Sequence, residues 1–115
     1  MIAVIFEVII ADGQKQQYLD LAAALKVELV KVKGFISIER FQSLADPDKL
    51  VSLSFWKDED AVLEWRNIEM HRSTQSAGRK YIFKDYHLRI ASVVRDYGMS
   101  DRQQAPVDSL AEHDS

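Results

Sequence analysis

The first residue with a possible chemical role is Glu7, an acidic side chain in an otherwise apolar stretch. It lies between Ile5 and Ile9 on one alternating face of a predicted strand, where an unpaired carboxylate would be costly to bury. In a pocket, this carboxylate would be placed to take a proton from a phenolic or enolic substrate. Alternatively, an arginine or the solvent at a sheet edge satisfies its charge, and the sequence supports both interpretations.

A second group of candidates follows one predicted helix. His71 and Gln75 are four residues apart, and Gly78 and Arg79 continue the same stripe. The histidine could act as a general base or bind a substrate oxygen. Arg79 could hold an anionic substrate or stabilise a developing enolate. The alternative is that His71 is a packed or surface histidine without a chemical role.

Aromatic residues form the third group. Trp65 and Trp56 could form the walls of a site for a flat ligand, although tryptophans at such spacing also fill cores. Tyr86 and His87 begin the last predicted strand, and Tyr86 is a candidate for binding substrate. Because neighbouring residues of a strand point to opposite faces, only one of these two can face a given pocket.

Several kinds of chemistry are excluded. The chain has no cysteine, so it has no disulfide, no thiolate metal ligand and no cysteine nucleophile. Its three histidines, His71, His87 and His113, lack the spacing of metal ligands. No glycine-rich nucleotide-binding motif is present. We therefore predict neither a metal site nor a cofactor.

The elements that must position these residues can be read from hydrophobic spacing. Residues 2–11 are apolar on both alternating faces, which is typical of a strand covered on both sides. The rest of the chain predicts a helix over 14–32, strands over 35–43 and 50–56, helical segments over 58–83 with a kink near 67–69, and a strand over 85–97.

This order, β-α-β-β-α-β, predicts an α+β protein with the ferredoxin-like fold, in which both helices cover one face of a four-stranded antiparallel sheet. The two-sided first strand then needs a second cover. Another copy of the sheet is the simplest one, so we expect a homodimer.

Length and charge limit the remaining possibilities. The chain has 115 residues, enough for one domain over residues 1–99 followed by a polar C-terminal tail over 100–115. The net charge of −3 and the absence of a basic stripe argue against a nucleic-acid partner. The start of the chain lacks the features of a signal peptide, and its apolar run is too short to span a membrane. We expect a cytoplasmic protein without a membrane partner.

Several motifs, in this order and spacing, resemble those of antibiotic-biosynthesis-monooxygenase domains over about residues 2–98. They are Gly34-Phe35-Ile36-Ser37-Ile38-Glu39-Arg40-Phe41, Leu53-Ser54-Phe55-Trp56 with Asp58-Glu59, Trp65-Arg66-Asn67, His71-Arg72 with Gln75 and Gly78-Arg79, Asp85-Tyr86, and Arg95-Asp96-Tyr97-Gly98. The resemblance implies a dimeric α+β barrel, in which two protomers pack sheet against sheet and each holds a pocket between its helices and its sheet.

The resemblance also implies an activity, that of a cofactor-independent monooxygenase acting on a small aromatic phenol, quinol or anthrone-like compound. The base would be Glu7 or His71, with Gln75 and Arg79 holding substrate oxygens. Glu7, Trp65 and His71 would then line one pocket. A non-catalytic module that binds a small hydrophobic molecule, or that serves in a stress response, is a second hypothesis.

Haem binding or degradation is a third hypothesis, and the residues can be compared with that branch of the family. Its members typically place an asparagine on the first strand, a tryptophan on a helix and a histidine ten residues later. Here the corresponding residues are Glu7, Trp65 and Gln75. Because two of the three differ, we do not favour haem degradation.

Overall fold

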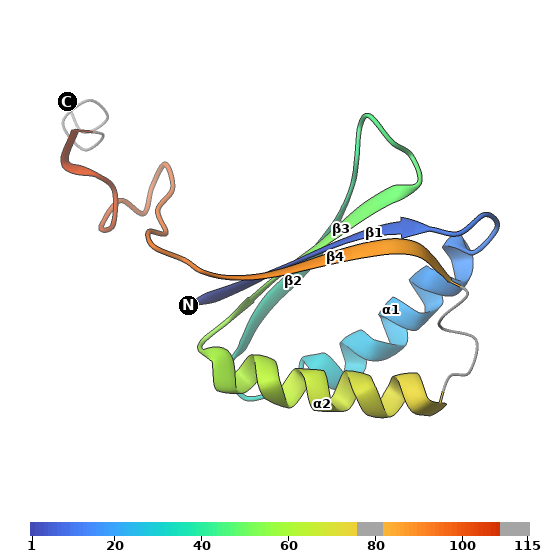
Figure 1. Cartoon of the computed structure of the whole chain (residues 1–115). Helices are drawn as coiled ribbons and strands as arrows, with labels where there is room; N and C mark the ends of the chain where they lie inside the picture. Colours follow the sequence, from blue (N-terminus) through green and yellow to red (C-terminus); the bar gives the residue numbers. More distant parts are fainter. Residues whose placement is uncertain (76–81, 109–115) are drawn as a thin grey trace.

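The computed structural model describes residues 1–75 and 82–108, and their side chains except those of residues 69–75. The predicted β-α-β-β-α-β order is confirmed. The elements are β1 (Ile2–Ile10), α1 (Lys15–Leu29), β2 (Phe35–Gln42), β3 (Lys49–Trp56), α2 (Glu59–Gln75) and β4 (Phe83–Ser92). The strands form one antiparallel sheet in the order β2-β3-β1-β4, and both helices lie on the same side of it (Figure 1).

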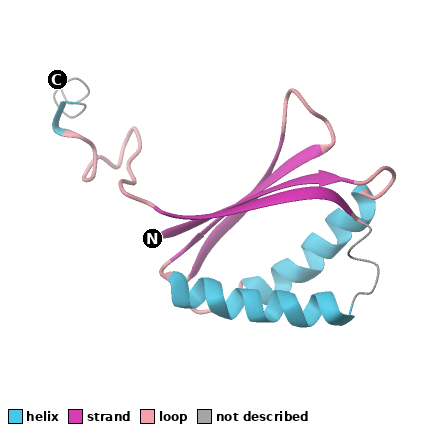
Figure 2. Ribbon diagram, viewed as in Figure 1, coloured by secondary structure: helices cyan, strands magenta, loops and turns pink. Residues whose placement is uncertain are grey.

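Alternation along β1 determines which side chains meet the helices. Its even-numbered residues lie on the helix-facing side, where Ile2, Val4 and Val8 are buried. The odd-numbered residues point to the opposite side, which no helix in the described part of the chain covers (Figure 2). We call this side the helix-free face; on β1 it carries Ala3, Ile5, Glu7 and Ile9.

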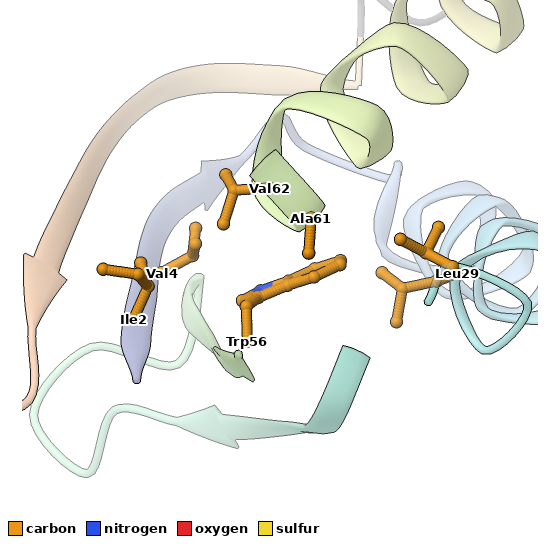
Figure 3. Packing of buried hydrophobic residues seen from close by; sticks show 7 residues of the cluster. Ile2, Val4, Leu29, Trp56, Ala61 and Val62 are labelled. Atoms are coloured by element: carbon orange, nitrogen blue, oxygen red, sulfur yellow. The ribbon is translucent and has the colours of Figure 1, made fainter. Parts of the chain in front are cut away.

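The larger part of the core is built around Trp56, whose side chain is completely buried (Figure 3). Its indole Nε1 donates a hydrogen bond of 2.9 Å to Ser54 Oγ, so the polar edge of the ring is satisfied inside the core. The other buried members come from β1, both helices and the segment after α1: Ile2, Val4, Leu29, Val32, Ala61 and Val62. This cluster fixes the N-terminal end of α2 over the sheet.

A second buried cluster lies toward the other end of β1. It consists of Val8, Ile10, Tyr18, Leu50 and Ile82. Phe6 and Phe83 pack at its margin, with their ring centroids 5.8 Å apart in an edge-to-face arrangement. The cluster thus attaches the start of β4 to α1 and β1.

Two local features position the N-terminal end of α2: a cap at Asp58 and a tight turn at Gly34 that packs against it. The Asp58 carboxylate accepts a hydrogen bond of 3.0 Å from the backbone N–H of Ala61, so Asp58 caps the N-terminus of α2. Gly34 follows α1 with a φ of 96°, a backbone conformation that favours glycine. A Cβ at Gly34 would lie 3.0 Å from the Cβ of Ala61, so the close approach of this turn to α2 also favours a glycine.

The main differences from the predicted elements are in α2 and β4. The helix α2 runs without interruption through the kink expected near residues 67–69 and continues to Gln75. The last strand was expected over residues 85–97, but it begins at Phe83 and ends at Ser92. The reason for its earlier end is pairing, because Ser92 is opposite Ile2, the first residue of β1. Val93 still bonds to Met1, and beyond it no strand of the described residues lies alongside the chain. No helix in the described ranges is long and apolar enough to cross a membrane.

Candidate functional site

Glu7 lies on the helix-free face and forms two ion pairs there. Its Oε2 is 3.4 Å from Lys49 Nζ on β3, and its Oε1 is 3.2 Å from Arg89 Nη1 on β4. The Glu7 side chain is 31% exposed, so water also reaches it. The sequence left two interpretations of Glu7 open. The structure agrees with the second of them, because an arginine and a lysine pair with the carboxylate.

Trp65 lies on the other side of the sheet. Its ring packs against the core cluster around Trp56, and the two indole rings stack with their centroids 6.3 Å apart. Glu7 and Trp65 are separated by the sheet itself, so the prediction that they line one pocket between helices and sheet is wrong. The physical reason is strand parity, because the residues adjacent to Glu7, namely Phe6 and Val8, are the ones that face the helices.

Three further candidates cannot be placed. The side chains of His71 and Gln75 and the whole of Arg79 lie outside the described residues. Their proposed roles remain predictions from the sequence.

Tyr86 is on the helix-facing side of β4, opposite Val8, and His87 points to the helix-free face, opposite Glu7. The predicted separation of these two neighbours is confirmed. The Tyr86 ring contacts Phe6, with the ring centroids 5.7 Å apart, but 62% of the residue remains exposed. The tyrosine thus has one side against an aromatic wall and the other open.

Tyr86 belongs to a row of exposed apolar residues. Leu88 and Ile90 follow it on the same side of β4, and each is 43% exposed. We call these three residues the β4 stripe. They face the same side as the helices, yet the described parts of α1 and α2 do not cover them, because β4 is one of the two edge strands of the sheet.

The β4 stripe presents aliphatic and aromatic surface and one phenolic hydroxyl, the kinds of group that line binding sites for flat hydrophobic molecules. Leu88, Ile90 and the neighbouring Phe6 were not among the site residues predicted from the sequence. The alternation of side chains along the strand was the signal that could have placed Tyr86, Leu88 and Ile90 on one face. The missing information was that β4 lies at the edge of the sheet.

In the described part of the chain, no group of three His, Asp or Glu residues is placed to hold a metal ion.

Comparison with known proteins gives a consistent result. The family model for antibiotic biosynthesis monooxygenase matches residues 1–77. The jasmonate monooxygenase ABM of Pyricularia oryzae is 42% identical over 93 residues, which are 81% of this chain and 43% of that protein. The uncharacterized protein YqjZ of Bacillus subtilis is 30% identical over 63 residues, which are 54% of this chain and 53% of that protein. The chain thus spans about half the length of the curated relatives it matches.

Solved structures agree on the fold. The cofactor-independent oxygenase SnoaB from Streptomyces nogalater superposes with a TM-score of 0.69, covering 83% of this chain and 94% of its own, at 10% sequence identity. At this identity the similarity concerns the fold alone. The sequence match extends over most of the domain, and the architecture is that of the matched structure. The chain belongs to the antibiotic biosynthesis monooxygenase family.

Proposed function

We propose that this protein is a monooxygenase that oxidises a small hydrophobic molecule of the phenol, quinol or anthrone type, bound beside β4 on the helix-facing side of the sheet. The observation that carries the proposal is the exposed β4 stripe, an apolar surface next to the core that the described helices leave open. Membership of the family and the 42% identical relative named as a monooxygenase support the reaction class.

The proposed reaction balances without any other reductant. Removing a proton from an anthrone-type substrate gives an electron-rich anion that can reduce dioxygen. A methylene carbon between aromatic rings becomes a carbonyl, and its two hydrogens leave as water with the second oxygen atom. All four electrons that reduce dioxygen come from the substrate. The protein needs to supply a site with little water, a base and hydrogen-bond donors for the oxygens.

Residue roles in this proposal follow from the side of the sheet. Tyr86 would bind the substrate, with Phe6 as an aromatic wall and Trp65 on the same side of the sheet. From the sequence, His71 would be the base, and Gln75 and Arg79 would hold oxygens. We leave Glu7 out, because its ion pairs lie on the helix-free face.

Jasmonate is a second candidate substrate, because the name of the Pyricularia oryzae relative points to it. Oxidation of jasmonate would differ in its source of electrons. Inserting one oxygen atom into a C–H bond takes only two electrons from the substrate, so a separate reductant must supply the other two. The requirement for a reductant therefore distinguishes the two substrate classes.

The test is oxygen uptake by the purified chain with a panel of anthrones and quinols and with jasmonate, each with and without a reductant. We expect uptake with an anthrone or quinol alone. Uptake only with jasmonate and a reductant would move the assignment to the second candidate. Ligand binding without any oxygen uptake would support the non-catalytic hypothesis, and a Soret band on haem titration would support the third.

A matched pair of variants tests whether the substrate binds at the β4 stripe. Leu88→Ser removes an aliphatic contact from the β4 stripe, whereas Leu44→Ser changes a fully exposed leucine in the turn between β2 and β3. We expect the KM for an active substrate, or the Kd of a bound one, to rise about tenfold in Leu88→Ser and to stay unchanged in Leu44→Ser. Equal values for both variants would mean that substrate binds elsewhere.

We also propose that the protein is a homodimer formed through the helix-free face. Apolar side chains from β1 and β3 occupy its middle: Ile5, Val51, Leu53 and Phe55. Glu7, Lys49 and Arg89 already form ion pairs within one chain, so a second copy could cover them without leaving the carboxylate unpaired. An obligate interface of this kind buries on the order of 2,000 Å² or more in total.

A further inference from the structure

The segment after β4 leaves the domain. The backbone N–H of Val93 donates to the carbonyl of Met1 at 3.0 Å, and beyond this point the chain runs away from the sheet and both helices (Figure 1). We call residues 93–108 the C-terminal arm. It contributes to a molecule whose longest dimension is 55 Å against a shortest one of 19 Å. The departure begins several residues before the polar tail that composition predicts over 100–115.

The C-terminal arm is folded on itself. Gln104 closes one loop, because its Oε1 accepts a hydrogen bond of 2.8 Å from the backbone N–H of Asp96 and its carbonyl accepts one of 3.3 Å from Arg95 Nη1. The backbone N–H of Gly98 donates to the carbonyl of Asp101 at 2.7 Å in a tighter turn. These bonds give the segment a defined shape, unlike a chain that only trails into solvent.

The C-terminal arm does not pack tightly on its own domain. An open hollow of about 420 Å³ lies at its base, lined by Met1 and by arm residues that include Arg95 and Gln104. Three apolar side chains along the arm are almost fully exposed: Val94 at 87%, Met99 at 94% and Val107 at 83%. Single exposed apolar residues are common, but here three of them lie along one short, shaped segment.

From this combination we infer that the C-terminal arm is an interface element, which docks its apolar side chains on a second copy of this chain. The inference rests on the homodimer proposed above. It commits to a second copy because the arm continues directly from β4, which borders the helix-free face. When two such faces meet, a segment that leaves the rim of one sheet extends over the edge of the other.

Two-fold symmetry would double the contacts of the arm. In a two-fold dimer each copy donates one arm and receives one, so every contact of the arm occurs twice. Docking would bury the apolar residues of both arms and add to the interface made by the sheet faces. The contacts of the two arms would then slow dissociation of the dimer.

The first experiment uses the full chain with Val94, Met99 and Val107 all changed to Ser, and measures the dimer dissociation constant by sedimentation equilibrium. The control changes three exposed apolar residues outside the arm, Val27, Val30 and Leu44, to Ser. We expect the arm variant to dissociate about 100-fold more readily than the wild type and the control variant to match the wild type. An unchanged dissociation constant in the arm variant would overturn the inference.

The second experiment exploits the absence of cysteine in the chain. Met99→Cys and Leu44→Cys each introduce a single thiol, whose reaction rate with a maleimide is measured above and below the dissociation constant. We expect the thiol at position 99 to react at least tenfold more slowly in the dimer, and the thiol at position 44 to react equally at both concentrations. Equal rates for both thiols at both concentrations would contradict docking.

The possible outcomes distinguish a failure of arm docking from a failure of the proposed homodimer or of the proposed monooxygenase activity. A wild type that is monomeric at every concentration overturns the homodimer and the arm together. A dimeric wild type with an arm variant that dissociates no more readily overturns the arm alone. Oxygen uptake, measured on the same samples, reports on the proposed monooxygenase activity independently of either result.

Discussion

At the scale of single residues, Glu7 and its two cationic neighbours form an ion-pair group on the helix-free face. Arg89 comes from β4 and Lys49 from β3, so the group joins three adjacent strands. All three side chains keep substantial exposure, and pairs of this kind contribute little to folding. We expect their importance to lie in how the face meets a partner.

For this reason we predict that Glu7→Gln leaves oxygen uptake unchanged and lowers the free energy of unfolding by less than about 1 kcal/mol. In the proposed dimer, Lys49 and Arg89 would lose their partner at the interface, so the dissociation constant should rise. Glu39→Gln, on the same face and exposed, is the control. A loss of 100-fold or more in kcat/KM without loss of stability would instead identify Glu7 as the base.

Trp65 offers a second prediction at this scale. Trp65→Ala removes the stack on Trp56, and we expect the free energy of unfolding to fall by about 3 kcal/mol, as for other large-to-small changes beside a core. Trp65→Phe should recover most of that loss, because it keeps an aromatic ring there. Denaturant unfolding measures both. If Trp65→Ala were as stable as the wild type but raised KM, the ring would serve the ligand and not the core.

At the scale of elements, the turn that leads from α1 into β2 shows how one residue sets the spacing between layers. Gly34 combines a positive φ with close contact to Ala61 in the first turn of α2. Its carbonyl accepts a hydrogen bond of 2.7 Å from the backbone N–H of Lys57, so the turn is also tied to the end of β3. A side chain at position 34 would press against Ala61, which would have to shift by a few tenths of an ångström to make room for it.

We therefore predict that Gly34→Ala lowers the free energy of unfolding by about 2 kcal/mol or more, as the sum of a strained φ and overpacking against Ala61. Gly13→Ala is the matched control, since Gly13 also has a positive φ, of 76°, but a Cβ there would have no atom within 4 Å. That variant should lose only about 1 kcal/mol. Equal losses in thermal or denaturant unfolding would mean that contact with α2 has no cost.

At the scale of the whole molecule, the two sides of the sheet have different proposed uses. The helix-facing side holds both core clusters and, at its margin, the β4 stripe. The helix-free face holds an apolar middle flanked by the charged side chains of β1, β3 and β4. We propose a ligand for the first side and a second chain for the other.

This division predicts that Leu53→Lys dissociates the proposed dimer, because it places a charge in the middle of the helix-free face. Leu63→Lys, on an exposed position of α2, should leave the dimer intact. Sedimentation equilibrium at micromolar concentration checks both variants, with circular dichroism to verify that each is folded. A monomeric wild type, or a dimeric Leu53→Lys, would place the interface elsewhere or remove it.

The sequence by itself determined the elements and the parity of their faces. Apolar alternation and helical spacing act over a few residues, so the β-α-β-β-α-β order and the opposite directions of Tyr86 and His87 could both be predicted. The family resemblance also comes from local motifs and is confirmed by the match over residues 1–77.

Only the tertiary structure decided which residues come together across the sheet. Glu7 meets Arg89, 82 residues away, because β1 pairs with β4, and no local pattern specifies that partner. The same pairing places β4 at the edge and leaves Leu88 and Ile90 open beside the core. Local spacing determines the face on which a side chain lies, whereas strand order determines what covers that face, and strand order depends on long-range packing.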